Sequence, residues 1–212
     1  MIDMNQVPES LTMSPVPQTR YYSLEEYLTG EELAEDKHEF YRGEIFLMAG
    51  GSPGHNRIAG NIFGQLYLQL RGKPCQPYNS DQRIAVKKYP LHTYPDISVI
   101  CGKLVLDTLD KQAATNPHTL IEVLSPSTES YNRGLKFEFY RSLPSLQEYI
   151  LVAQDRPAVD RFVRQANGQW LLFDYHGLEA AVPLVEIGCQ LRLSDIYEGV
   201  EFGEENVASM PE

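Results

Sequence analysis

The sequence predicts one mixed α/β domain whose central mixed β-sheet is flanked by helices, and three observations favour this class. Its 212 residues are enough to bury a core of their own. Short apolar segments typical of buried strands run through the middle of the chain. Segments with helical periodicity lie before and between these strands, which is typical of a sheet covered by helices.

The first elements of this domain are predicted to be a short helix and a hairpin. Ser23 and Glu26 have the spacing of a capping box, which predicts a helix that starts directly after Ser23. Arg42-Gly43 then separates two short runs rich in aromatic and apolar residues, and this pattern predicts a β-hairpin.

A longer helix is expected from residue 55 to residue 71, ending at Gly72. Apolar side chains recur at every fourth position of this segment, so they share one helical face. These positions are Ile58, Ile62, Leu66 and Leu70. The segment is therefore predicted to be an amphipathic helix.

The centre of the chain is predicted to be rich in strands, at 83–86, 96–100 and 120–124. A helix is expected to follow, with Ser127 or Thr128 as its N-cap. This helix carries an apolar stripe of Tyr131, Leu135 and Phe139 and a second stripe of Asn132, Lys136 and Tyr140. Three more strands are predicted at 148–152, 159–164 and 170–175.

The two ends of the chain differ from this domain in composition. Residues 1–19 contain three prolines among polar residues and are predicted to be a flexible arm, while 201–212 is predicted to be an acidic tail beyond a single domain over 20–200. The chain has neither a run of 18 apolar residues nor the basic and apolar start of a secretory signal. We therefore expect no membrane-spanning segment and no secretory leader.

The three cysteines favour a cytoplasmic protein. Cys75, Cys101 and Cys189 are widely spaced and odd in number, so they are predicted to form neither a disulfide framework nor a zinc site. We expect each to fill space in the core, as free cysteines do in a reducing compartment.

The net charge of −11 argues against a nucleic-acid partner, but its distribution weakens that objection. Residues 1–39 hold nine acids and two bases, and residues 186–212 hold seven acids and one base. The remaining 40–185 hold 15 bases and 13 acids, a charge of +2. A nearly neutral middle allows contact with a polyanion without requiring it.

Two carboxylates inside apolar strands are the most informative feature of the chain. Asp96 and Glu122 lie 26 positions apart, each within a predicted strand. A carboxylate among aliphatic side chains is costly to desolvate, so it needs a compensating partner. If the two strands pair, both groups can share a divalent cation, because Mg²⁺ accepts two carboxylates, a backbone carbonyl and water. The carbonyl of Val123 is the expected third ligand.

A positive side chain for the same site is expected from the following helix. Leu124 occupies the position two residues after Glu122, so no lysine lies there, and Lys136 is the next candidate. Its ammonium would orient the attacking water or stabilise negative charge in the transition state.

These residues resemble the PD-(D/E)XK nuclease superfamily and, more closely, the Uma-type family of bacterial restriction endonucleases, over roughly residues 22 to 198. The matching features are His38-Glu39 with Gly43-Glu44, His55, Pro95-Asp96, the run from Glu122 to Thr128, Lys136 with Tyr140, and Glu148-Tyr149. The resemblance implies a restriction-endonuclease-like core and Mg²⁺-dependent hydrolysis of DNA, with Mn²⁺ as a substitute.

The resemblance also implies a role for individual residues. Asp96 and Glu122 would be metal ligands, Lys136 the catalytic lysine, and Glu39 an additional acid near the site. The sequence departs from the pattern at Asn132, where relatives often carry Asp. That departure is expected to alter helix capping or hydrogen bonding near the site while metal binding is retained.

Other interpretations stay open at this point. Glu122 could pair with an arginine such as Arg83, Lys136 could be a solvated helix lysine, and His55 is expected to be structural. Tyr140 is expected to pack, and a patch of Lys87, Lys88, Arg71 and Lys73 is expected to be solvated. The alternative function is a non-catalytic nucleic-acid-binding or self-assembling module with the same fold. A homodimer is expected because cutting both DNA strands usually needs two sites.

Overall fold

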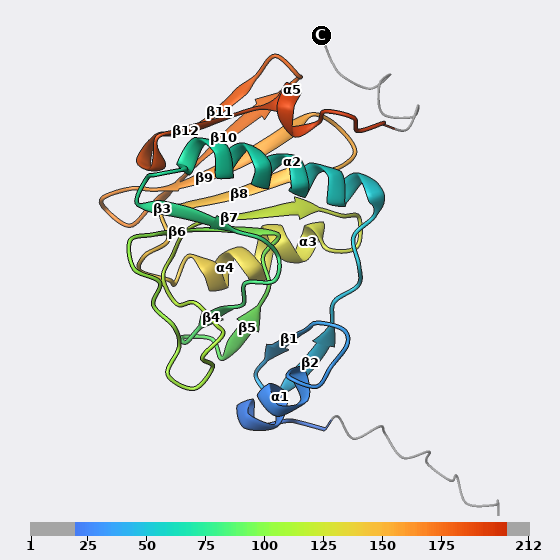
Figure 1. The fold of residues 1–212 in the computed structure, drawn as a ribbon, viewed down its shortest axis with the longest axis vertical. Helices are drawn as coiled ribbons and strands as arrows, with labels where there is room; N and C mark the ends of the chain where they lie inside the picture. Colours follow the sequence, from blue (N-terminus) through green and yellow to red (C-terminus); the bar gives the residue numbers. More distant parts are fainter. Residues whose placement is uncertain (1–19, 203–212) are drawn as a thin grey trace, which may run out of the picture.

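The computed structural model describes residues 20–202 as a mixed α/β fold built around a six-stranded sheet (Figure 1). The strand order is β10-β9-β8-β7-β6-β3, and only the β7–β8 pair is parallel. These strands are β3 Cys75–Tyr78, β6 Ile97–Cys101, β7 Pro117–Leu124, β8 Glu148–Ala153, β9 Ala158–Arg164 and β10 Trp170–His176. The expected central mixed sheet flanked by helices is confirmed.

A second, four-stranded sheet has the order β2-β1-β5-β4. The hairpin β1 His38–Tyr41 and β2 Glu44–Leu47 lies with α1 Leu24–Glu31 at one end of the molecule (Figure 1). The strands β4 Ile84–Val86 and β5 Leu91–Thr93 connect this hairpin to the rest of the fold, because β5 pairs with β1.

Helices cover both faces of the six-stranded sheet. The apolar face of α2, Pro53–Leu70, packs with Ile121, Val123 and Ile150 into one core, and Ile58, Ile62, Leu66 and Leu70 are fully buried as predicted. The other face packs Leu120, Leu124 and Leu151 against the helical segment that follows β7. Side chains alternate along β7, so Glu122 lies on this second face with Leu120 and Leu124.

The helical segment after β7 consists of three parts, namely α3 Glu129–Tyr131, a π-helical turn η1 Asn132–Lys136, and α4 Phe137–Tyr140. A π turn is wider than an α turn, so it rotates the chain less per residue. The apolar stripe expected on this helix is therefore interrupted, since Leu135 is 53% exposed. The second stripe, Asn132, Lys136 and Tyr140, is the one that is buried against the sheet.

The last elements complete the α2 side of the fold. The two-stranded sheet of β11 Ala181–Leu184 and β12 Cys189–Arg192 packs on α2 together with α5 Leu193–Ile196, and the 3₁₀ turn η2 Val185–Ile187 lies between the two strands. These elements, like β3 and β5, were not predicted from the sequence. The predicted capping box, hairpin and central strands are confirmed.

The expectation that all three cysteines are unpaired is wrong for two of them. Cys75 and Cys101 face each other directly across the β3–β6 pair and form a disulfide, while Cys189 is free and buried. The cysteines therefore give no support for a reducing compartment.

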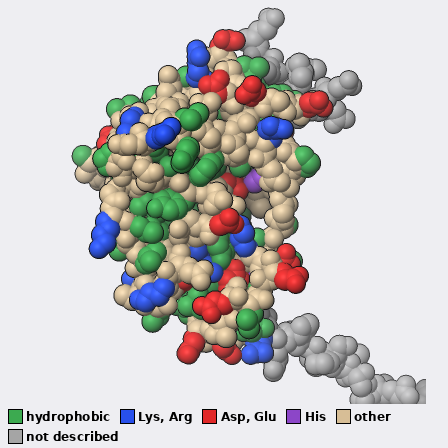
Figure 2. All heavy atoms as spheres, in the orientation of Figure 1, with side chains coloured by type: hydrophobic (Ala, Val, Ile, Leu, Met, Phe, Trp, Pro, Cys, Tyr) green, Lys and Arg blue, Asp and Glu red, His purple; other side chains and the backbone are tan. Residues whose placement is uncertain are grey.

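The predicted division into an arm, a domain over 20–200 and a tail stays a prediction. The arm 1–19 and all but two residues of the tail 201–212 lie outside the described residues. Within residues 20–202, none of the helices has the length and apolar character needed to cross a bilayer. Figure 2 shows Asp and Glu side chains at the end of the molecule that carries α1 and the β1–β2 hairpin and again at the opposite end.

Candidate active site

Asp96 and Glu122 come together because β6 and β7 pair, although Asp96 lies directly before β6 and not inside the strand as expected. Ile97 is opposite Ile121 in this antiparallel pair, which places Asp96, one residue before β6, opposite Glu122. Asp96 Oδ2 accepts a hydrogen bond of 2.7 Å from the backbone N–H of Val123. The carboxylate thus takes the place of the next hydrogen-bond acceptor in the β6–β7 ladder, close enough to Glu122 for its charge to raise the pKa of that group.

Glu122 is held by two donors from the helical segment. Its Oε1 lies 2.9 Å from Lys136 Nζ and accepts a 2.9 Å hydrogen bond from the hydroxyl of Tyr140. Only 4% of the Glu122 side chain is exposed. Burial raises the pKa of Glu122 to about 7, and the nearby Asp96 and Glu39 carboxylates add to this effect while Lys136 opposes it.

Lys136 is the last residue of the π turn and lies between two carboxylates. Its Nζ is 3.3 Å from Oε1 of Glu39, in addition to its contact with Glu122. Burial alone would lower the pKa of this ammonium, but the charges of Glu122 and Glu39 outweigh burial and hold the pKa well above its usual range. Lys136 is therefore a buried but permanently charged group. Thr93, on β5, donates a short hydrogen bond to the same oxygen of Glu39.

His55 contacts the site from the first turn of α2. Its Nε2 lies 3.3 Å from Asp96 Oδ2. Burial lowers the pKa of His55, but the hydrogen bond and the charge of Asp96 exceed that effect, so the net shift is upward. The other ring nitrogen, Nδ1, is buried without a hydrogen-bond partner among the described residues, and the backbone at Gly51 lies close enough that a Cβ there would approach it to 2.5 Å.

The donor set has the chemistry that a hard divalent cation requires. Asp96 and Glu122 each use one carboxylate oxygen in the contacts above, and the second oxygens, Asp96 Oδ1 and Glu122 Oε2, make no hydrogen bond to residues 20–202. Mg²⁺ commonly takes one or two carboxylates and retains several waters. Within the described part of the chain, no group of three or more His, Cys, Asp or Glu residues is arranged to hold a metal. A cation at the Asp96–Glu122 pair would therefore need water or backbone oxygens to complete its coordination.

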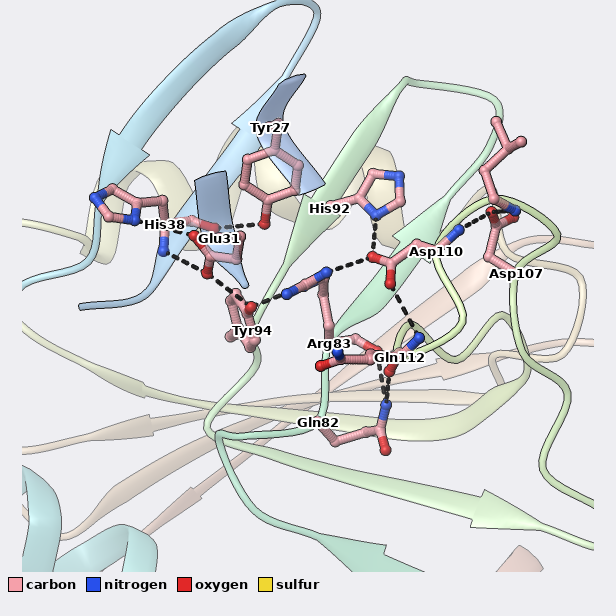
Figure 3. A network of polar contacts seen from close by, with 11 residues as sticks. Tyr27, Glu31, His38, Gln82, Arg83, His92, Tyr94, Asp107, Asp110 and Gln112 are labelled. Atoms are coloured by element: carbon pink, nitrogen blue, oxygen red, sulfur yellow. Dashed lines mark hydrogen bonds and ion pairs between the residues drawn. The ribbon is translucent and has the colours of Figure 1, made fainter. Parts of the chain in front are cut away.

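A buried polar network fixes the two strands that carry Glu39 and Thr93 (Figure 3). Glu31 on α1 accepts hydrogen bonds from the backbone of His38 and from Tyr94, which are the neighbours of those two residues in sequence. Arg83 then links Tyr94 to Asp110, with distances of 2.7 Å to each. Figure 3 also shows His92 on Asp110, 2.9 Å away, so the network connects α1, β1, β5, the residue before β4 and the loop at 107–112.

This network rules out one interpretation of Glu122. Arg83 was considered as its partner, but Arg83 pairs with Asp110, and Glu122 pairs with Lys136. Lys136 is also not a solvated lysine, because only 6% of its side chain is exposed.

The structure thus brings together Asp96, Glu122, Val123, Lys136 and Glu39, which sequence analysis had named as candidates. Three neighbours of the site are not among the predicted site residues: His55 was expected to be structural and Tyr140 to pack, and Thr93 was not predicted. For Tyr140, the available signal was its position four residues after Lys136, on the same helical stripe. No comparable signal identifies Thr93, whose contact depends on the pairing of β1 with β5.

Comparisons with known proteins identify the family and the fold of the chain. The family described as "Putative restriction endonuclease", Uma2, matches residues 24–194. Two uncharacterised proteins of Synechocystis are similar: slr1290 is 37% identical over 180 residues (85% of this chain and 93% of the relative), and sll1609 is 35% identical over 170 residues (80% and 96%). A crystal structure described as a putative nuclease belonging to DUF820, from Anabaena variabilis, has a TM-score of 0.65 at 18% identity. It covers 82% of this chain and 96% of its own, and at this identity it shows a shared fold.

Proposed function

The chain belongs to the Uma2 family of putative restriction endonucleases, and from this premise we propose that it is an endonuclease that hydrolyses DNA phosphodiester bonds with Mg²⁺. The observation that carries the proposal is the arrangement of Asp96 and Glu122 opposite each other on paired strands, with the buried ammonium of Lys136 on Glu122. Structural contacts account for one oxygen of each carboxylate, since Glu122 pairs with Lys136 and Asp96 with Val123 N–H and His55, but they leave Asp96 Oδ1 and Glu122 Oε2 without a partner among residues 20–202.

Asp96 and Glu122 would hold the cation, and the backbone carbonyl of Val123 is the proposed third protein ligand. The bound ion would supply a water of lowered pKa and would offset negative charge on the phosphoryl oxygens. Mn²⁺, which also accepts oxygen ligands, is expected to substitute. Burial raises the pKa of Glu122 to about 7, and a divalent cation beside this carboxyl would lower that pKa and favour the ionised form.

The remaining residues orient these groups. Lys136 is held by Glu39 and Glu122, so its charge is fixed beside the place where a phosphate would lie and can stabilise the transition state. Tyr140 donates to Glu122 and leaves the second oxygen of that carboxylate available. His55 plays the same part for Asp96.

The experiment is cleavage of plasmid and oligonucleotide DNA with Mg²⁺, Mn²⁺ or a chelator. Wild type should cut only when metal is present. Asp96→Asn and Glu122→Gln should each lower the rate by about 100-fold or more, because each removes a charge that acts in the transition state. Cleavage that is equal in the two variants and wild type would overturn the proposal.

A matched control is available on the other face of the sheet. Glu148 is also a fully buried strand glutamate in an ion pair, with Arg161 at 3.0 Å. Glu148→Gln should retain cleavage per folded molecule. DNA binding that persists unchanged without metal, combined with no cleavage under any metal, would instead support the non-catalytic module. A homodimer and a cytoplasmic location remain part of the proposal.

A further inference from the structure

A row of cationic and aromatic side chains lies beside α4, where it packs on Phe139 and Phe137. Tyr41 and Tyr89 both pack on Phe139, with ring centroids 4.9 Å and 4.8 Å away. The guanidinium of Arg42 lies 5.2 Å from the Tyr41 ring, and Lys88 Nζ lies 5.4 Å from the Tyr89 ring. Cations and aromatic rings therefore alternate over this surface.

The row continues into a hollow of about 330 Å³. Its lining includes Lys88, Tyr89, Arg141 and Trp170. Arg141 and Trp170 both contact Phe137, which connects them to one another across the helix. The single acid in the lining, Glu138, accepts a hydrogen bond from the hydroxyl of Tyr89.

Three cations of this row have no fixed partner. The side chains of Arg42, Lys88 and Arg141 are exposed and make no hydrogen bond or ion pair with residues 20–202. The neighbouring Arg164 differs, because it donates hydrogen bonds to the carbonyls of Leu146, Arg141 and Leu143 and so caps the end of the helical segment. Two of these free cations, Lys88 and Arg141, line the hollow, and unpaired cations at a hollow suit a phosphate, whereas Arg164 is part of the fold.

The backbone at Arg42 is a second, independent observation. Its φ of 50° makes it the one non-glycine residue with positive φ within residues 20–202. This position is the first of a two-residue hairpin turn, where Asn, Asp or Gly is favoured. An arginine kept in a conformation that suits other residues better indicates a use for its side chain.

The row is also connected to the candidate active site. Glu39 and Tyr41 are two residues apart on β1 and therefore point to the same side of that strand. Glu39 contacts Lys136, and Tyr41 contacts Phe139. A strand of nucleic acid that follows the row would therefore arrive next to Glu39.

We infer that Tyr41, Arg42, Lys88, Tyr89, Arg141 and Trp170 form a strip that binds the phosphate backbone of a nucleic-acid strand and leads it to the Glu39 side of the site. Arg42, Lys88 and Arg141 bind phosphates, and the aromatic rings cover the sugar and base edges. The inference rests on the proposed function for its substrate class, since a nuclease must hold the strand it cuts.

Trp170 provides the readout, because it is the one tryptophan of the sequence and lines the hollow. An oligonucleotide is titrated into the protein in chelator, where cleavage is prevented, and the emission of Trp170 is followed at several salt concentrations. The variant is the triple substitution Arg42→Asn, Lys88→Ala and Arg141→Ala. Asn at position 42 keeps the positive φ accessible.

The matched control is Arg71→Ala, Lys103→Ala and Arg192→Ala, which removes the same charges from exposed positions elsewhere on the surface. The strip variant should bind the oligonucleotide at least about 10-fold more weakly than wild type. The slope of log binding constant against log salt concentration should also be smaller by about two to three units, since each phosphate contact contributes slightly less than one unit. The control should keep the slope and the change in Trp170 emission. The assignment of the strip would be overturned if both triple variants lost the same affinity for the oligonucleotide. It would also be overturned if the emission of Trp170 did not change when the oligonucleotide binds to wild type.

Two further measurements separate this inference from the proposed function and from general anion binding. With cleavable DNA, the strip variant should show a raised KM and an unchanged kcat. If wild type does not cut DNA but the strip variant still binds the oligonucleotide more weakly than the control variant, the proposed function fails and the strip is retained. Inorganic polyphosphate at equal phosphate concentration should displace the oligonucleotide only partly, and complete displacement would overturn nucleic acid as the ligand.

Discussion

At the scale of single residues, Lys136 has the most demanding environment in the molecule. An ammonium that is almost fully buried must remain charged to satisfy two carboxylates, and its raised pKa agrees with that requirement. If Lys136 is removed, Glu122 and Glu39 are left close together without a compensating charge.

Lys136→Met should therefore affect both catalysis and stability. The rate of DNA cleavage should fall by about 100-fold or more, since a fixed charge beside the phosphate is lost. The free energy of unfolding in chelator should fall by about 3 kcal/mol or more, because a buried ion pair is broken on one side only. The measurements are single-turnover cleavage and urea unfolding.

Lys73→Met serves as the control, because Lys73 Nζ donates a hydrogen bond to the carbonyl of Gly188, far along the chain from the site. This variant should cleave like wild type. A Lys136→Met variant with wild-type cleavage would show that the lysine is only structural.

At the scale of elements, the buried network around Arg83 and Asp110 joins α1 and β1 to the rest of the fold. The pKa of Asp110 is lowered to about 2 because its hydrogen bonds to His92 and Arg83 outweigh the effect of burial, which by itself raises the pKa. A carboxyl with a lowered pKa in the folded state stabilises that state above its unfolded pKa, and this contribution is lost as the pH falls through the folded value.

We expect Asp110→Asn to lower the free energy of unfolding by about 2 kcal/mol or more at pH 7, and to have a smaller effect near pH 2. Urea unfolding at several pH values measures the difference. Asp174→Asn, an exposed aspartate that also contacts a histidine, should change stability little at either pH. If Asp110→Asn lowered the free energy of unfolding by the same amount at every pH, the role of the ionised Asp110 carboxylate in stability would be contradicted.

The disulfide ties an edge strand to the sheet. Cys75 and Cys101 are 26 residues apart in sequence, so closing this loop should stabilise the fold by about 3.5 kcal/mol through loss of entropy in the unfolded chain. Replacing both with serine should lower the free energy of unfolding by about that amount under oxidising conditions. Wild type with its disulfide reduced should have the same free energy of unfolding as the double variant. DNA cleavage by the folded protein should be unchanged in both. Equal stability of oxidised wild type and the double variant would argue against the bond.

The elements also show what the sequence could predict. Regular periodicity identified α2, and strand alternation placed Glu122 on one face of β7. The strand β3 was missed because Pro77 interrupts its pattern, although proline is tolerated on an edge strand, and the Cys75 pairing was missed with it. The position of Leu135 depends on a π turn that 3.6-residue periodicity does not describe. The contacts of Arg83 and Thr93 depend on pairing between distant segments, which local patterns cannot specify.

At the scale of the whole molecule, the uneven charge is consistent with a polyanionic substrate. Acids lie around α1 and the hairpin (Figure 2), and the strip begins with Arg42 in the turn of that same hairpin and continues through Lys88 to Arg141 beside α4. Net charge alone is therefore a poor guide to the partner of this protein.

The most direct test of the account is Mn²⁺ binding, measured by electron paramagnetic resonance without nucleic acid. Wild type and the Glu148→Gln control should bind one ion with similar affinity. Asp96→Asn and Glu122→Gln should each bind at least about 10-fold more weakly, because each removes a charged oxygen ligand. Equal Mn²⁺ binding by wild type and both site variants would contradict the claim that these two strand carboxylates form a metal site.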